Sequence, residues 1–222
     1  MTDSRICIAL DFQNKAEVKE FLEKFNDEKL YVKVGMELFY GEGIEIIKMI
    51  KEMGHNIFLD LKLHDIPNTV KSAMKQLAKL EVDMVNVHAS GSIAMMKAAI
   101  EGLEAGKTGD KRPLCIAVTC LTSLDQEVLD NELLINDTLE NVVLKWATNA
   151  KEAGLDGVVC SVHEAKAIHE ACGNDFLTVT PGIRLAGNSA DDQKRVATPE
   201  YAKEQGCDMI VVGRSITKST DP

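Results

Sequence analysis

The stretch FLDLKLHDIPNTV, residues 58–70, places a carboxylate on either side of one lysine. Asp60 and Asp65 flank Lys62 within six positions, in a segment that begins like a buried strand. Nearby carboxylates favour the charged form of a lysine. A fixed ammonium can stabilise developing negative charge and can also deliver a proton. The spacing therefore indicates a charged site around Lys62 that suits such chemistry.

The period of a strand decides where these side chains point. Asp60 and Lys62 are two residues apart, so they share one side of a strand, and the leucines between and beside them share the other. We expect the leucines to pack against helices and the charged pair to face the interior. Asp65 falls just past the strand, where the chain must turn before Pro67.

The elements that hold this site alternate along the chain. Eight short apolar runs are separated by longer amphipathic stretches such as 16–25, 43–53, 68–80 and 138–154. This alternation predicts parallel strands with helical crossovers, and a (β/α)₈ TIM barrel is the economical fold for 222 residues. An open doubly wound sheet is the alternative, but LDFQNKAE stands where its glycine-rich fingerprint should follow the first strand. The predicted strands are 5–11, 30–35, 56–62, 82–88, 114–120, 155–161, 176–182 and 207–214.

We predict a single domain over residues 1–222, because no linker or low-complexity tract divides the chain. The sequence stops at TKSTDP, just after the eighth strand. The helix that normally closes such a barrel is therefore expected to be absent or cut short.

Polar residues gather at the carboxyl ends of the predicted strands, which is where active sites of TIM barrels lie. An isolated Asp-x-Lys pair is better explained as a structural charge network. Several ionisable groups at one mouth favour an active site instead, because perturbed ionisable clusters concentrate there. Residues at these ends are Asp11, Lys33, Asp60, Lys62, His88, Thr122, Ser123, Arg184, Gly213 and Arg214.

The last two strands end in glycine and arginine, which predicts a phosphate site. TVTPGIR supplies Arg184, and VVGRSI supplies Gly213 and Arg214 before a helix start. Loops after strands seven and eight often bind phosphate in this fold. Gln193 lies in the intervening loop RLAGNSADDQKR, whose composition is that of a mobile lid. His64, by contrast, is expected to face away from Lys62, towards the helices or a loop, and His88 to make a hydrogen bond at a strand end. Neither is expected to act as a base.

Composition narrows the class of protein. The net charge of −10 argues against a nucleic-acid partner, which would need a basic face. No apolar stretch approaches the roughly 20 residues of a membrane helix. The start of the chain lacks the pattern of a secretory signal, so we expect a cytoplasmic protein. The six cysteines are scattered without metal-ligand spacing, which predicts reduced thiols and no metal site.

Four motifs together resemble the bacterial type of the orotidine 5′-monophosphate decarboxylase family: LDLKLHDIPNT, TPGIR, DDQKRVATP and VVGRSIT. The resemblance runs from ALDF to GRSIT, nearly end to end. It implies a TIM barrel that converts orotidine 5′-monophosphate into UMP and CO₂ in de novo pyrimidine synthesis. It also implies a homodimer that needs neither a metal nor an organic cofactor.

The resemblance implies a role for each matching residue. Lys62 would protonate C6, and Asp60 would stand against the leaving carboxylate. Asp65 would be contributed to the neighbouring subunit's site. The remaining substrate-binding residues would be Lys33 and Asp11 on the ribose side, Thr122 near the pyrimidine, Arg184, Gln193, Gly213 and Arg214 at the phosphate, and also Ile66, Thr69 and Pro181.

Two alternatives remain open. Sugar-phosphate decarboxylases of the same superfamily share Asp-x-Lys-x-x-Asp but use Mg²⁺, with an acidic residue expected at the strand-two position. Lys33 stands there in this chain, which favours the metal-free reaction. A non-catalytic nucleotide-binding barrel is the other alternative, and the intact set of Asp60, Lys62 and Asp65 argues against it.

Overall fold

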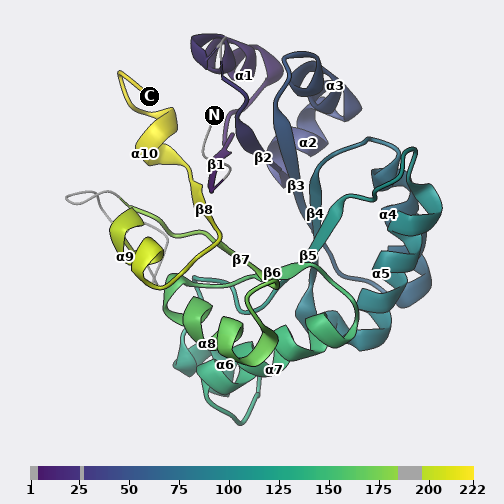
Figure 1. Cartoon of the computed structure of the whole chain (residues 1–222), viewed down its shortest axis with the longest axis vertical. Helices are drawn as coiled ribbons and strands as arrows, with labels where there is room; N and C mark the ends of the chain where they lie inside the picture. The colour runs from purple at the N-terminus through teal and green to yellow at the C-terminus, as the bar shows by residue number, and fades with distance from the viewer. Residues whose placement is uncertain (1–4, 26–27, 185–196) are drawn as a thin grey trace.

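The computed structural model describes residues 5–25, 28–184 and 197–222. Its strands form one closed parallel barrel in chain order, so the predicted (β/α)₈ fold is confirmed (Figure 1). Seven strands lie inside their predicted ranges, and β3 extends one residue beyond its predicted end. The strands are β1 (Ile6–Ala9), β2 (Tyr31–Gly35), β3 (Asn56–Leu63), β4 (Met84–His88), β5 (Leu114–Val118), β6 (Gly157–Val159), β7 (Leu177–Thr180) and β8 (Met209–Val212).

Helices surround the barrel and connect successive strands (Figure 1). The alternation predicts one helical stretch between successive strands, and α2 and α6 are additional helices that precede α3 and α7 in their crossovers. The short helix α10 follows β8 and lies against β1. The helices are α1 (Lys15–Leu22), α2 (Met36–Glu42), α3 (Ile44–Glu52), α4 (Pro67–Ala78), α5 (Ser92–Gly106), α6 (Gln126–Asn131), α7 (Leu139–Glu152), α8 (Val162–Cys172), α9 (Pro199–Glu204) and α10 (Arg214–Thr217), with the 3₁₀ turns η1 (Glu23–Phe25) and η2 (Ala89–Gly91).

Local sequence signals explain where the helices begin. At α7 the Thr138 side chain accepts a hydrogen bond from the Asn141 amide, which satisfies a donor that the helix leaves unpaired. At α8, Ser161 and Glu164 form a reciprocal capping box. Pro67 occupies the first turn of α4, where its missing N–H costs nothing.

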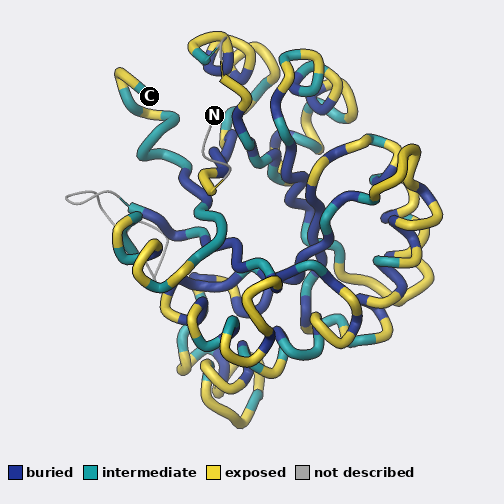
Figure 2. Tube along the Cα trace, in the orientation of Figure 1, coloured by how far each residue is buried: buried dark blue, intermediate teal, exposed yellow. Residues whose placement is uncertain are grey.

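Apolar side chains fill two layers, one between strands and helices and one inside the barrel. Leu59 and Val85 belong to the outer layer, whereas Phe58, Met84 and Ile116 belong to the inner one. The strands are accordingly buried, and exposed residues lie on the outer faces of the helices (Figure 2). The barrel interior is therefore a packed core, as this fold requires.

Aspartates tie neighbouring strands together at the amino-terminal end of the barrel. Each stands directly before an even-numbered strand and accepts a hydrogen bond from an amide of the preceding strand, at 2.7 or 2.8 Å. The three pairs are Asp83 with Ile57, Asp156 with Cys115, and Asp208 with Thr178.

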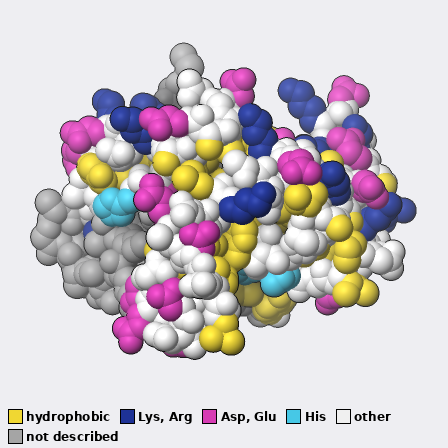
Figure 3. All heavy atoms as spheres, turned by 90° about the horizontal axis from the view of Figure 1, so that it is seen from below, with side chains coloured by type: hydrophobic (Ala, Val, Ile, Leu, Met, Phe, Trp, Pro, Cys, Tyr) yellow, Lys and Arg dark blue, Asp and Glu magenta, His cyan; other side chains and the backbone are white. Residues whose placement is uncertain are grey.

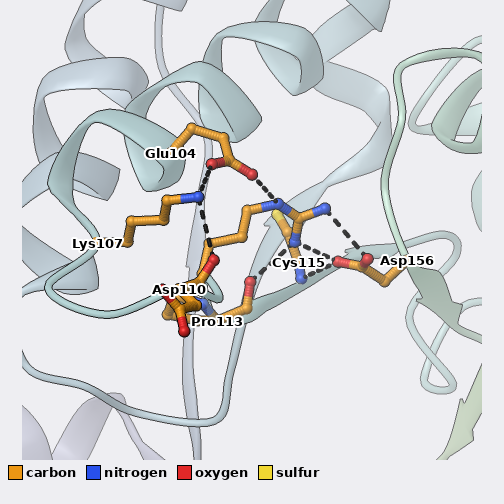
Figure 4. A network of polar contacts seen from close by, with 7 residues as sticks. Glu104, Lys107, Asp110, Pro113, Cys115 and Asp156 are labelled. Atoms are coloured by element: carbon orange, nitrogen blue, oxygen red, sulfur yellow. Dashed lines mark hydrogen bonds and ion pairs between the residues drawn. The ribbon is translucent and has the colours of Figure 1, made fainter.

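Asp156 also pairs with a guanidinium (Figure 4). Arg112 donates to both carboxylate oxygens of Asp156, at 2.6 and 3.1 Å. Glu104 lies 3.4 Å from Arg112 Nε and 2.7 Å from Lys107 Nζ. This bidentate pair stands at the end of the barrel opposite the strand carboxyl termini.

The outer surface carries both signs of charge. On the face drawn in Figure 3, acidic and basic side chains are intermixed with apolar ones. Within the three described segments, no helix is both long and apolar enough to cross a membrane.

Candidate active site at the carboxyl ends of the strands

A cavity of about 280 Å³ opens where the strands end. Most of the residues that the sequence predicted for the site lie around it. Its walls combine charged side chains on one side with apolar ones such as Val118 and Val159. The predicted residues that line it are Asp11, Lys33, Asp60, Lys62, Thr122, Ser123, Pro181, Arg184, Gly213 and Arg214.

Charges alternate along one wall of the cavity. Asp60 is central: Lys62 Nζ lies 2.7 Å from its Oδ1, and Lys33 Nζ lies 3.4 Å from its Oδ2. Lys33 Nζ also lies 3.5 Å from Oδ1 of Asp11. The Lys62 side chain keeps 26% exposure, while the Asp60 side chain keeps 10%. The ammonium of Lys62 is therefore held by a buried carboxylate yet remains open to the cavity.

Mutual attraction keeps these groups charged. Burial by itself would raise the pKa of Asp60, but the ammoniums of Lys33 and Lys62 and a hydrogen bond from Asn86 bring it below its ordinary value. Burial would likewise lower the pKa of Lys33, but Asp60 and Asp11 raise it above its ordinary value. Both directions agree with a paired, ionised cluster.

The strand that carries Asp60 and Lys62 is irregular at the site. Between Leu59 and Leu63, β3 advances four residues while its partner β4 advances two, from Val85 to Val87. Lys62 has φ 53°, a left-handed conformation that is uncommon for a residue with a side chain. The predicted sidedness still holds, because Leu59, Leu61 and Leu63 all pack in the outer layer.

Asn86 belongs to this cluster, and sequence reasoning missed it. It lies in the middle of β4, is 1% exposed, and donates from Nδ2 to Asp60 Oδ1 at 2.6 Å. Its Oδ1 accepts from the backbone N of Lys62 at 2.8 Å. The feature of the sequence that could have identified it was a single asparagine among the apolar residues of the predicted strand 82–88.

The predicted phosphate residues lie on another part of the cavity wall. Arg184 follows β7, and Gly213 with Arg214 follow β8. Arg184 Nη1 also donates to the carbonyl of Ile183 at 2.9 Å. Gln193 and all of the predicted lid after Arg184 lie outside the described residues.

Three predicted site residues do not line this chain's own cavity. Asp65, Ile66 and Thr69 are exposed where α4 begins, and Ile66 keeps 67% exposure. The carboxylate of Asp65 accepts a hydrogen bond from the Ile66 amide at 2.6 Å. They are positioned to face outwards from this chain.

The rings of His64 and His88 lie beside each other. The ring centroids are 5.6 Å apart, and neither residue lines the cavity. Burial, His64 and Lys62 together lower the pKa of His88. Among the residues that the structure describes, no group of three or more His, Cys, Asp or Glu side chains is arranged to hold a metal ion.

Comparisons with known proteins show which family this chain is similar to. The family model of orotidine 5′-phosphate decarboxylase / HUMPS matches residues 4–222. Orotidine 5′-phosphate decarboxylase of Bacillus mycoides (strain KBAB4) is 62% identical over 218 residues, which are 98% of this chain and 92% of the relative. The enzyme of that name from Bacillus cytotoxicus is 61% identical over the same shares.

Solved structures show the same likeness. The crystal structure of orotidine 5′-phosphate decarboxylase from Lactobacillus acidophilus has a TM-score of 0.89 and 46% identity, covering 99% of this chain and 94% of that one. A conserved protein from Geobacillus kaustophilus has a TM-score of 0.88 and 53% identity, covering 98% and 94%. By sequence and by structure, this chain belongs to the orotidine 5′-phosphate decarboxylase / HUMPS family.

Proposed function

We propose that this chain decarboxylates orotidine 5′-monophosphate to UMP and CO₂ in de novo pyrimidine biosynthesis, without a metal or an organic cofactor. The observation that carries the proposal is the alternating cluster of Asp11, Lys33, Asp60 and Lys62, which faces one cavity together with Arg184 and Arg214. The names of the similar Bacillus enzymes support the same substrate.

Lys62 is the proton donor in this proposal. When the bond between C6 and the carboxylate breaks, CO₂ leaves and the electron pair stays on C6. The Lys62 ammonium stabilises that pair and then transfers a proton to C6, after which water reprotonates the amine. Asp60 holds the ammonium at 2.7 Å and faces the leaving carboxylate.

The rest of the cavity binds the parts of the substrate that do not react. Lys33 and Asp11 contact the ribose, and Thr122 and Pro181 lie by the pyrimidine. Arg184 and Arg214 bind the phosphate with the Gly213 backbone, and we assign Gln193 to the same group of phosphate ligands. Binding energy from a remote phosphate can be used to organise the reacting end.

Replacing Lys62 with alanine tests the proposal. We expect the native chain to convert orotidine 5′-monophosphate to UMP, followed by absorbance, and Lys62→Ala to lose about 10³-fold or more in kcat. Lys51→Ala is the matched control, because Lys51 pairs with Glu81 at 2.8 Å outside the cavity. A native chain that forms no UMP, or a Lys62→Ala variant as active as Lys51→Ala, contradicts the proposal.

Treatment with EDTA tests the metal-free part of the proposal. In a Mg²⁺-dependent relative, the position of Lys33 would hold an acidic metal ligand. In this chain the Lys33 ammonium lies 3.4 Å from Asp60 Oδ2 and itself supplies positive charge beside that carboxylate. We expect kcat/KM to be unchanged after dialysis against EDTA and unchanged again when Mg²⁺ is added. Loss with EDTA and recovery with Mg²⁺ would favour the sugar-phosphate alternative.

We further propose that Asp65, Ile66 and Thr69 complete the site of a second copy of this chain in a homodimer. Their exposure at the start of α4, away from their own cavity, supports this arrangement. A carboxylate from a partner would add a second acid beside Lys62 and help to hold its ammonium in place.

A further inference from the structure

We propose that Asn86 is a positioning residue for the Asp60–Lys62 pair, fixing the carboxylate and the lysine backbone through one amide side chain. The inference rests on the proposed decarboxylase activity and adds a residue to its machinery. Asn86 does not line the cavity, so it acts through its neighbours and not by touching the substrate.

The two ends of the amide match their partners in chemical type. The backbone N–H of Lys62 is a donor and needs the Oδ1 acceptor at 2.8 Å, while the ionised carboxylate of Asp60 needs the Nδ2 donor at 2.6 Å. A leucine of similar size would satisfy neither group. An ionised aspartate would satisfy only the amide and would set a second negative charge against Asp60.

The irregularity of β3 explains why such a side chain is needed there. Because β3 and β4 lose register between Leu59 and Leu63, regular backbone pairing with β4 is interrupted around Lys62. Asn86 keeps its own backbone register with Ile116 of β5 and extends its side chain to β3. The uncommon φ of 53° at Lys62 is held by this contact, as strained backbone at a site requires support from its surroundings.

The same amide also fixes which oxygen of Asp60 serves which lysine. Oδ1 accepts from both Asn86 and Lys62, so Oδ2 is left to face Lys33. Rotation of the carboxylate would break both contacts at Oδ1 at once. Asn86 therefore determines the direction in which the Lys62 ammonium is presented to the cavity.

Two substitutions with different chemistry test this role by kcat and KM measured across pH. In Asn86→Leu we expect kcat to fall by about 100-fold with KM near the native value, because misplacing a reacting group costs rate while the phosphate contacts stay intact. Thr119→Val is the control: it removes a buried hydrogen bond of 2.9 Å to the Val159 carbonyl and should leave kcat unchanged.

Asn86→Asp gives a readout that loss of packing would not produce. Two carboxylate oxygens about as close as the present 2.6 Å contact must share a proton. The protonated side chain donates to Asp60 and accepts from the Lys62 amide, as Asn86 does. The ratio of variant to native kcat should therefore be highest in acid and fall as pH rises. The other charged groups around this pair, Lys62, Lys33, Asp11 and His88, are present in both proteins, so the ratio removes their direct contribution. Asp60 contacts the introduced carboxylate, so the fall in the ratio belongs to the two carboxylates as a pair.

The outcomes separate the two proposals. Near-native kcat in Asn86→Leu, or a ratio for Asn86→Asp that does not change with pH, contradicts the role of Asn86 while leaving the decarboxylase activity in place. No turnover by the native chain overturns both. If Asn86→Leu fails to fold by thermal unfolding, the pH dependence of Asn86→Asp decides alone.

Discussion

At the scale of single residues, Asp60 shows how a buried charge can be tolerated. Moving a carboxylate out of water costs several kcal/mol unless partners replace the lost hydration. Among the residues that the structure describes, Asp60 has three such partners, the nitrogens of Lys62, Asn86 and Lys33 at 2.7, 2.6 and 3.4 Å. Removing any one of these partners leaves a buried charge or a polar atom without its counterpart. We therefore regard Asp60 and its three partners as one unit.

The titration of His88 is a prediction at this scale. Its pKa is lowered by burial first and then by His64 and Lys62, against an opposing effect of Asp60. An unperturbed histidine has a pKa of about 6.5. In an NMR titration we expect the His88 ring to protonate at a lower pH than that. The resonance is assigned by its absence from a His88→Gln variant.

The same shift has a consequence for stability. A folded pKa below the unfolded value means that the unfolded chain takes up the proton more readily. Relative to His88→Gln, the native chain should therefore lose free energy of unfolding as pH falls below about 6.5, until it passes the folded pKa. A midpoint at or above the ordinary value would contradict the effect of burial.

Sequence reasoning found the charged residues of the site but not their neutral support. Asp60, Lys62 and Lys33 stand out because charged side chains are rare in central strands. Asn86 shares a strand with apolar residues, and an isolated amide there has many structural uses. Only the distances to Asp60 and to the Lys62 amide, 2.6 and 2.8 Å, distinguish those uses.

At the scale of elements, the two ends of the barrel serve different purposes. Charges at the carboxyl ends of the strands face a cavity, whereas Asp83, Asp156 and Asp208 at the other end face backbone amides of neighbouring strands. Contacts that hold strands together thus lie at one end of the barrel, and the residues that line the cavity lie at the other, as is general in this architecture.

Asp156→Ala tests that separation. The substitution removes the acceptor of the Cys115 amide and the bidentate partner of Arg112, so we expect the free energy of unfolding to fall by about 3 kcal/mol. The kcat of the folded protein should not change. Urea unfolding and the decarboxylation assay measure the two quantities.

Glu101→Ala is the matched control for Asp156→Ala. Glu101 forms an ion pair of 2.6 Å with Lys71, but both side chains are about half exposed or more, at 61% and 47%. Such surface pairs contribute little. Equal losses of stability in the two variants would argue against a special role for the aspartates before the even strands.

The strands could be predicted well and some helices could not. Apolar runs in a parallel barrel are buried on both sides, which gives strands such as β4 and β5 a strong signal. Helix α2 directly follows β2, and α6 spans only six residues, so neither offers a long apolar period. The register shift in β3 depends on contacts with β4 and leaves no periodic trace.

At the scale of the whole molecule, the proposed homodimer can be tested by complementation. Mixing Lys62→Ala with Asp65→Ala chains should restore activity, because one of the two sites in each mixed dimer then has both residues. Under random exchange we expect roughly a quarter of the native activity. Native mass spectrometry verifies that mixed dimers form. Mixed dimers without activity would show that Asp65 is not shared.

The register shift in β3 also limits how this strand can change in length. Because the strand gains two residues relative to β4, an even number, Leu59, Leu61 and Leu63 stay on the helix side throughout. A single insertion or deletion at the same place would exchange the two sides of the strand beyond it. Leucine side chains beyond the change would then face the cavity, and the Lys62 side chain would face the helices. Parity, and not only composition, is therefore a condition that any redesign of this strand must meet.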